Sequence, residues 1–390
     1  MIDTLLGKIA GFFEKDFLFS SFLPALIFLV SLFMTGALTV GIEAVWVWID
    51  SRTTTQTAAI ISAATLLVVV VAYVLHALRG TFTRVWSGNS GFFLLLGWRT
   101  LGEFIQRRRF LRLRKNAERF STWPVLEEKF ANDVDTVYSS ELPAPSPEQL
   151  KSLLKTASRI RQTKYQQVTE SLLRDLVTAY GRYSGETLGD VYDEAKRALI
   201  DHDEEEREQI QSDASSLDRQ FGSLHSVKAT GLGNIIESYQ QYPAKRYKLE
   251  SEIFWPRLRK VVPSEYLSTV QEPRILLDFA LAMASLALVY CVMVLIVGPW
   301  LWYEFDIWIL LSLVSLVITY FFYRLAVNAA YQYGELVRST FDLFRLDLMQ
   351  ALGLPRPANF FVEQKQWEEF SQLIVYGTSG NFELAPEGNK

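Results

Sequence analysis

Four long windows that are almost free of charged residues constrain this chain more than any other feature. They cover residues 17–40, 58–78, 276–302 and 307–327. A helix that crosses the hydrocarbon core of a bilayer needs about 20 consecutive, mainly apolar residues, and each window reaches that length. Helices buried in soluble proteins seldom run so far without a charge. The sequence therefore predicts an integral membrane protein with two pairs of transmembrane helices.

The start of the chain does not read as a cleavable signal peptide. A signal peptide has a shorter apolar core, followed by a cleavage site of small residues. Here the apolar window is longer, and Glu14 and Asp16 precede it. Apolar residues recur at helical spacing before that window, which predicts an amphipathic helix on the membrane surface over residues 1–16.

The distribution of Lys and Arg predicts the orientation of the spans. The connection 41–57 contains only Arg52, and the connection 303–306 contains no basic residue. Ten basic residues against two acidic ones follow the second span: Arg79, Arg84, Arg99, Arg107, Arg108, Arg109, Arg112, Arg114, Lys115 and Arg119. Positive loops stay in the cytoplasm. We therefore expect both termini and the long insertion in the cytoplasm of a bacterial cell, with the spans in its inner membrane.

The predicted fold class is an all-α integral membrane protein with a mostly helical cytoplasmic domain inserted between the second and third spans. The expected parts are the surface helix 1–16, spans over 17–78, the cytoplasmic domain 79–275, spans over 276–327, and an extension with a tail over 328–390. Within the insertion, apolar periodicity predicts a pair of antiparallel helices between about residues 148 and 220. The last span continues its helical pattern from Ile307 to Leu352. That helix would be roughly 69 Å long.

The basic segment 79–119 begins the insertion and has two interpretations. Apolar residues between 92 and 105 precede a run of cations, which favours an interfacial helix that binds anionic lipid headgroups. The alternative is an ordinary core helix of the cytoplasmic domain. The predicted lipid-contacting residues are Arg107, Arg108, Arg109, Arg112, Arg114 and Lys115.

No catalytic, cofactor-binding or metal-binding motif is evident. The chain has one cysteine, Cys291, and three histidines. The Gly231–Leu232–Gly233 sequence lacks a preceding strand and a third glycine, so it favours a turn that starts a helix over a phosphate-binding loop. The acidic run 201–206 could hold a divalent cation, although consecutive carboxylates on a helix point in different directions, which favours a solvated helix face.

Aromatic and basic residues alternate between positions 242 and 260. That mixture suits stacking on, and charge pairing with, a nucleotide or a lipid headgroup, and it equally suits a docking surface beside the membrane. The candidate residues for a ligand or docking site are Lys245, Arg246, Tyr247, Trp255 and Arg257.

Polar residues within the spans are few. Asp278, Arg324 and Asn328 lie near cytoplasmic ends, where side chains usually extend to the interface. The absence of a charge at any span centre argues against an ion-coupled transporter. Small residues at Ala59 and Ala63, Ala280 and Ala284, and Ser312 and Ser315 favour close helix contacts. Pro24 deprives the carbonyl of Ser20 of its helical partner and favours a kink.

From Thr230 onward the chain resembles an uncharacterised family of four-span bacterial membrane proteins. The resemblance rests on the segments 230–234 (T-G-L-G-N), 242–247 (Y-P-x-x-R-Y), 255–258 (W-P-R-L), 333–336 (Y-G-E-L) and 342–348 (D-L-F-R-L-D-L). It implies a bacterial setting and a four-span plan, and it assigns no site residue.

These features favour a homo-oligomeric inner-membrane protein, a channel or pore-type effector controlled by its cytoplasmic domain. One alternative is a membrane scaffold or adaptor that recruits a cytoplasmic partner, and the least favoured is a membrane-bound enzyme. The expected partners are an anionic lipid bilayer, further copies of the chain, and a cytoplasmic protein or small ligand. The net charge of −4 gives no reason to expect nucleic acid.

Overall fold

The computed structural model describes residues 15–89, 99–118, 208, 211–301 and 305–377. These residues are almost all helical, and none of them lies in a β-strand, which confirms an all-α fold for the described part. The chain divides into two compact units, residues 1–107 with 219–390, and residues 108–218. The predicted surface helix 1–16 and helix pair 148–220 fall mostly outside the described residues.

Four helices are long and apolar enough to cross a membrane, as predicted. The first comprises α2 (Lys15–Phe17), a π-helical turn η1 (Leu18–Phe22) and α3 (Leu23–Val40). The second is α5 (Thr54–Trp86), the third is α13 (Ser264–Leu301) and the fourth is α14 (Phe305–Ala351). As the helical pattern predicted, α14 is a single helix, with 47 residues and a length of about 70 Å.

The first span contains a widened turn where the sequence predicted a kink. The amide of Leu23 donates to the carbonyl of Leu18, five residues back, and Pro24 lies in the first turn of α3. Proline has no N–H group to donate to the carbonyl of Ser20, so the helix lacks one regular hydrogen bond at this point. Turns of this kind are rare and often lie at functional sites.

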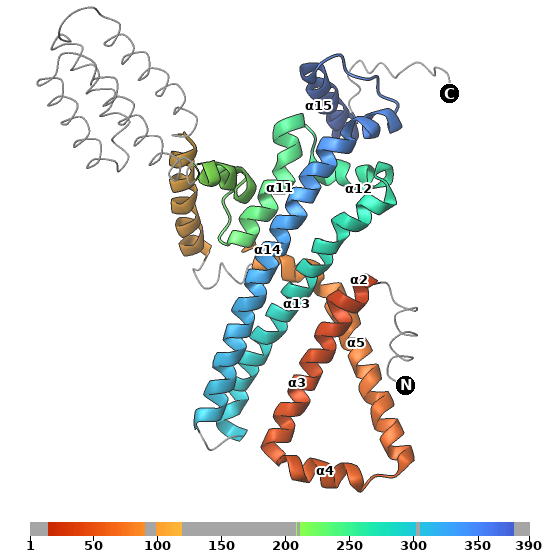
Figure 1. Cartoon of the computed structure of the whole chain (residues 1–390), viewed down its shortest axis with the longest axis vertical. Helices are drawn as coiled ribbons and strands as arrows, with labels where there is room; N and C mark the ends of the chain where they lie inside the picture. The colour runs from red at the N-terminus through yellow and green to blue at the C-terminus, as the bar shows by residue number, and fades with distance from the viewer. Residues whose placement is uncertain (1–14, 90–98, 119–207, 209–210, 302–304, 378–390) are drawn as a thin grey trace, which may run out of the picture. The chain divides into compact units, whose positions relative to one another are not determined.

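A short helix, α4 (Ile42–Asp50), connects the first two spans. No helix was predicted here, since residues 41–57 were interpreted only as a connection. Gly41 turns the chain into α4 with a φ of 94°, in the region that favours glycine. In Figure 1, α3 and α5 diverge from their shared end and α4 crosses between their other ends.

Small residues bring α13 and α14 together, as their spacing predicted. Ala280 and Ala284 are fully buried, and Ser315 donates from Oγ to the carbonyl of Ala287 over 2.6 Å. Close backbone approach of this kind is the main source of helix association in lipid. Ala59 and Ala63 of α5, in contrast, are exposed.

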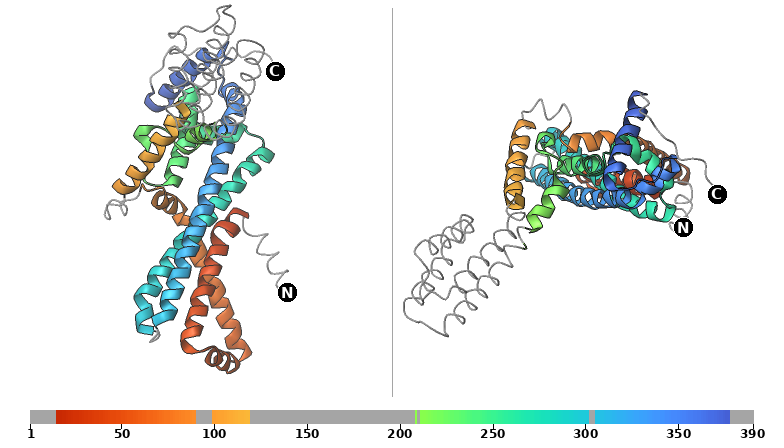
Figure 2. Two further views of the ribbon diagram at one scale, coloured as in Figure 1. Left: turned by 60° about the vertical axis from the view of Figure 1, so that its left-hand side comes forward. Right: turned by 90° about the horizontal axis from the view of Figure 1, so that it is seen from above.

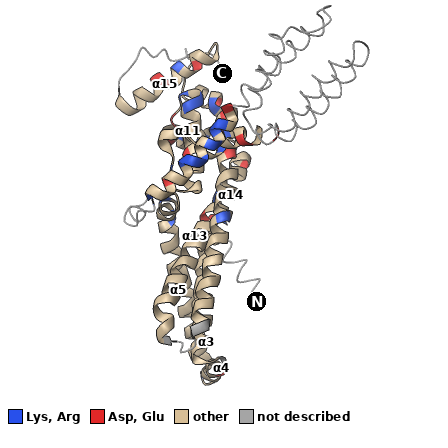
Figure 3. Ribbon diagram, turned by 90° about the vertical axis from the view of Figure 1, so that its left-hand side faces the viewer, with Lys and Arg blue, Asp and Glu red and all other residues tan. Residues whose placement is uncertain are grey.

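The C-terminal half of α14 is surrounded by α11 (Gly231–Tyr247), α12 (Ser251–Val261) and α15 (Phe360–Tyr376). Figures 1 and 2 show these helices grouped around α14 beyond the spans. Their shared core contains the buried aromatic residues Phe254, Phe341 and Trp367. We call this group the polar part, because Lys, Arg, Asp and Glu residues recur along its helices in Figure 3, whereas the spans are nearly free of them.

Candidate functional site

Arg79 of α5 joins charged residues from two other spans. Its Nη1 atom donates to Asp16 Oδ2 over 2.8 Å and lies 3.7 Å from Asp278 Oδ2. Its Nη2 atom donates to His76 Nδ1 over 2.5 Å. Because Asp16 lies in α2 at the start of the first span and Asp278 belongs to α13, one guanidinium connects three of the four spans. We call Asp16, Arg79, Arg274 and Asp278 the arginine node.

The centre of the node is shielded from solvent, whereas the side chains of Asp16 and Arg274 are 39% and 38% exposed. The side chain of Asp278 is only 5% exposed and that of Arg79 is 15% exposed. Arg274 Nε, four residues before Asp278 on α13, donates to Asp278 Oδ2 over 3.3 Å. Arg79 Nε and Asp278 Oδ1 are buried and have no hydrogen-bond partner among the described residues. The expectation that Asp278 extends to the interface is therefore wrong, because two arginines hold its carboxylate inside the bundle.

Three spans have a weak point in their helical backbone close in sequence to the node. The π-helical turn η1 begins two residues after Asp16. Gly80 follows Arg79 inside α5, and a Cβ atom there would meet nothing within 4 Å, so packing does not require glycine. Pro273 precedes Arg274 inside α13 and leaves the carbonyl of Thr269 without its helical donor. Glycine and proline both weaken a helix interior, so these helices can bend near the contacts that tie them together.

Aromatic side chains connect the node to the polar part. The guanidinium of Arg274 lies over the Tyr333 ring at 5.6 Å, and Tyr333 meets Tyr239 edge to face at 5.6 Å. Burial raises the pKa of the Tyr239 hydroxyl above its ordinary value, despite the opposing effect of Arg274. Gly334 lets α14 approach α11, since a Cβ atom there would lie 2.9 Å from Tyr239 Cδ1. The node therefore continues from α13 through α14 into α11.

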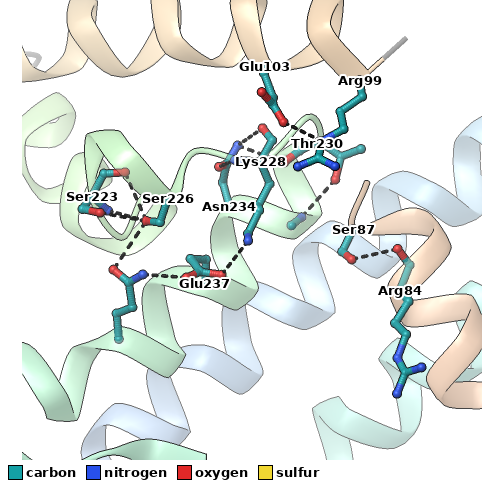
Figure 4. Close-up of polar contacts among 12 residues, drawn as sticks. Arg84, Ser87, Arg99, Glu103, Ser223, Ser226, Lys228, Thr230, Asn234 and Glu237 are labelled. Atoms are coloured by element: carbon teal, nitrogen blue, oxygen red, sulfur yellow. Dashed lines mark hydrogen bonds and ion pairs between the residues drawn. The ribbon is translucent and has the colours of Figure 1, made fainter. Parts of the chain in front are cut away.

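The T-G-L-G-N segment forms a junction between the end of α5 and the start of α11 (Figure 4). Thr230 Oγ1 accepts from the amide of Gly233 over 3.0 Å and donates to the carbonyl of Trp86 over 2.9 Å. Asn234 Oδ1 accepts from the amide of Lys228 over 2.7 Å. The helix-start interpretation of this segment is confirmed, because Thr230 is the N-cap of α11.

Two glycines allow this junction to close. A Cβ atom on Gly233 would lie 2.1 Å from the carbonyl oxygen of Ser87, and one on Gly102 would lie 2.6 Å from that of Ala229. The carbonyls that end α5 thus lie against the amides that begin α11, so the negative end of one helix dipole meets the positive end of another. Movement of the second span would be transmitted directly to α11.

A second polar cluster attaches α15 to α11 and α14. Tyr247 Oη donates to Asp342 Oδ1 over 2.6 Å, and Tyr242 Oη donates to the same carboxylate over 2.9 Å. Arg345 lies 4.4 Å over the Tyr247 ring and donates from Nε to Glu363 Oε1 over 2.7 Å. Burial, then the bond to Asp342, raises the pKa of both tyrosines above the ordinary value. Both hydroxyls therefore stay protonated donors at neutral pH.

The five candidate ligand or docking residues do not form one surface. Lys245, Arg246 and Arg257 are exposed, and Lys245 donates to the carbonyl of Gly222. Tyr247 is buried in the cluster around Asp342, and Trp255 is half-buried against Phe341, with 5.9 Å between ring centroids. Ligand binding by the exposed cations stays a prediction, whereas Tyr247 and Trp255 serve the packing of the polar part.

The six predicted lipid-contacting residues all lie on a helix over residues 99–118, and all are exposed: Arg107, Arg108, Arg109, Arg112, Arg114 and Lys115. Arg114 pairs with Glu118 over 2.8 Å. In the same unit, Asn116 donates to Asp213 Oδ2 over 2.7 Å, so this helix contacts the helical residues 211–218. Their exposure agrees with lipid contact, which stays a prediction. The acidic run 201–206 lies outside the described residues.

Within the part of the chain that the structure describes, no group of three or more His, Cys, Asp or Glu side chains could hold a metal ion. Comparison of the chain with protein-family models, with curated proteins and with solved structures finds no significant match.

Sequence reasoning noted Asp16, Arg79 and Asp278 separately but did not bring them together. Each one lies at the end of a different span, and all three ends face the same side in the predicted topology. Opposite charges at matching depth in different spans are the signal that could have suggested the node. A charged side chain near lipid is costly unless it pairs with an opposite charge.

Proposed function

We propose that this chain is a homo-oligomeric membrane effector whose spans are controlled by its polar part. The arginine node carries the proposal, because Arg79 ties the first three spans together beside weak points in their helices. Arg79 Nε and Asp278 Oδ1 are buried without hydrogen-bond partners among the described residues. The node therefore stabilises this packing of the spans less than a fully hydrogen-bonded network would. Such a contact suits a resting state that has to be released.

The continuous helix α14 supports the proposed control. It runs from the spans into the polar part and contacts the node through Tyr333. Farther along, it attaches α11 and α15 through Asp342 and Arg345. A change in the packing of α11 or α15 would therefore reach the node through a single continuous helix.

The effector we propose conducts ions or small solutes through a pore that several copies form together. Four spans of one chain enclose little space, and charges are confined to their ends. We further propose that the polar part faces the cytoplasm and that the spans lie in the inner membrane of a bacterium. The cations that follow the second span support this orientation.

The mass of the purified full chain in lipid nanodiscs, followed by ion flux in liposomes, tests this function. The account expects a defined oligomer and flux above that of protein-free liposomes. A monomer at all protein concentrations, or an oligomer without flux under any condition that loosens the node, would contradict it.

A membrane scaffold is the second candidate, and α15 is the observation that favours it. Phe361 and Tyr376 are 75% and 74% exposed on this helix, which lies beyond the spans. Exposed aromatic residues of this size are typical of protein-docking surfaces. If the protein is a scaffold, liposomes with the wild-type chain should show no ion flux. Phe361→Ser should then abolish recruitment of the cytoplasmic partner in cells.

A further inference from the structure

The connecting helix α4 has almost no packing partner among the residues that the structure describes. Of its side chains that the structure describes, only that of Val45 is partly buried. Trp46 is 61% exposed and Val47 is 70% exposed. An isolated helix shorter than about 12 residues is marginal in water, and α4 has nine residues. A surface outside the described chain must therefore stabilise it.

The residues of α4 divide into a polar edge and a broad apolar face. Glu43 and Asp50 are seven residues apart, so they lie above one another on the same edge of the helix. Trp46 and Val47 flank that edge. The opposite face carries only apolar side chains: Ala44, Val45, Trp48 and Ile49. A helix with this division suits a boundary between water and hydrocarbon.

The lengths of the neighbouring spans place α4 at such a boundary. From Phe17 to Val40 the first span has 24 helical residues, about 36 Å, against about 30 Å for a bilayer core. The second span starts again at Thr54. Both ends of the connection therefore lie at one membrane face, and Figures 1 and 2 agree that α4 crosses between them.

We propose that α4 lies in the plane of the membrane interface and that its partner is the lipid surface itself. Its apolar face enters the boundary between headgroups and acyl chains, and Glu43 and Asp50 face water. Tryptophan favours this depth. Arg52 stacks 4.8 Å over Trp48 and holds one of these rings. Because Glu43 and Asp50 are acidic, α4 gains nothing from anionic headgroups. A zwitterionic lipid such as phosphatidylcholine is therefore sufficient for its binding.

This placement gives α4 a mechanical role. Because it lies across the ends of α3 and α5, lipid that holds α4 also holds these two spans apart at that face. The inference requires the spans to cross a bilayer but is independent of the oligomeric effector proposed above. An absence of ion flux would leave it unaffected.

The test uses two pairs of adjacent positions in the full chain, with Cys291→Ser as the background. Cysteine replaces Ala44 or Ile49 on the apolar face, and Glu43 or Asp50 on the polar edge. Each variant is labelled with an environment-sensitive fluorophore and placed in phosphatidylcholine vesicles. Quenching is measured with aqueous iodide and with spin-labelled phosphatidylcholine. Using two pairs keeps the test valid if one variant fails to fold.

The labels at Ala44 and Ile49 should be quenched by the spin-labelled lipid and should show iodide quenching at least about threefold weaker than their polar neighbours. Equal iodide quenching within both pairs would overturn the proposal, because α4 would then lie in water. Protection of Ala44 and Ile49 from both quenchers would also overturn it, since a second copy of the chain would then cover α4.

Discussion

A carboxylate near the end of a membrane span has two ways to avoid lipid, and Asp278 takes the less predictable one. It could extend to the interface, as its position in the sequence suggested. Instead it is buried between Arg79 and Arg274. Arg274 is four residues away on the same helix, but Arg79 belongs to another span, 199 positions earlier. One sequence does not show which residues so far apart come into contact.

Replacing Asp278 with Asn removes the charge while keeping the shape of the side chain. It should destabilise the fold by about 2 kcal/mol, because the largely buried Arg79 and the partly exposed Arg274 lose their shared counter-charge. The thermal unfolding midpoint in detergent micelles measures the effect. Asp347→Asn is the control, since Asp347 is exposed on α14 and its loss should change stability by less than about 0.5 kcal/mol. Equal midpoints for the two variants would show that the node contributes no stability.

The tyrosines bound to Asp342 give an alkaline signature. Burial, then the bond to Asp342, raises the pKa of Tyr242 and Tyr247. A group whose pKa is raised on folding contributes stability below its unfolded value, about pH 10. That contribution is lost only as the pH rises through the folded value. In an ultraviolet titration, the increase in tyrosinate absorbance above pH 10 should therefore be smaller for a Tyr242→Phe and Tyr247→Phe double variant than for the wild type. If the double variant instead lost only tyrosinate absorbance that appears near pH 10, the two tyrosines would titrate as exposed groups. That result would contradict their burial beside Asp342.

At the scale of elements, length and apolar periodicity predicted the helices, but they did not predict the contacts between helices. The four apolar helices and the single helix α14 follow from uninterrupted apolar patterns. The helix α4 was missed because nine residues between two long spans read as a connection. The T-G-L-G-N turn was anticipated as a helix start. Its fit against Ser87 was not, because that contact depends on where α5 ends.

The junction between α5 and α11 predicts opposite outcomes for two glycines in one turn. Gly233→Ala should destabilise by roughly 2–3 kcal/mol, because its Cβ atom would overlap the carbonyl of Ser87. Gly231→Ala should be neutral or slightly stabilising, since a Cβ atom there meets nothing within 4 Å. Thermal unfolding of the two variants compares them directly. Matching losses would mean that the two helices do not meet as closely as described.

At the scale of the whole molecule, the first three spans are tied together at one end, and this tie contacts the polar part. Arg79 provides the tie, Tyr333 and Tyr239 carry it into α11, and α14 extends it to α15. In the same region Tyr242 and Tyr247 meet Asp342, and Trp255 meets Phe341. Two of the segments on which the predicted resemblance rests, 242–247 and 342–348, thus pack against each other.

Ion flux from liposomes containing Arg79→Ala, compared with Arg84→Ala, tests the central claim most directly. Arg84 is exposed on the same helix and makes a matched control for the loss of charge. A charged hydrogen bond contributes about 1.5–3 kcal/mol, so releasing the node should raise resting flux about tenfold or more. Arg84→Ala should leave flux at the wild-type level. Equal flux for the two variants, with both oligomers intact, would contradict the claim that the arginine node holds the resting state.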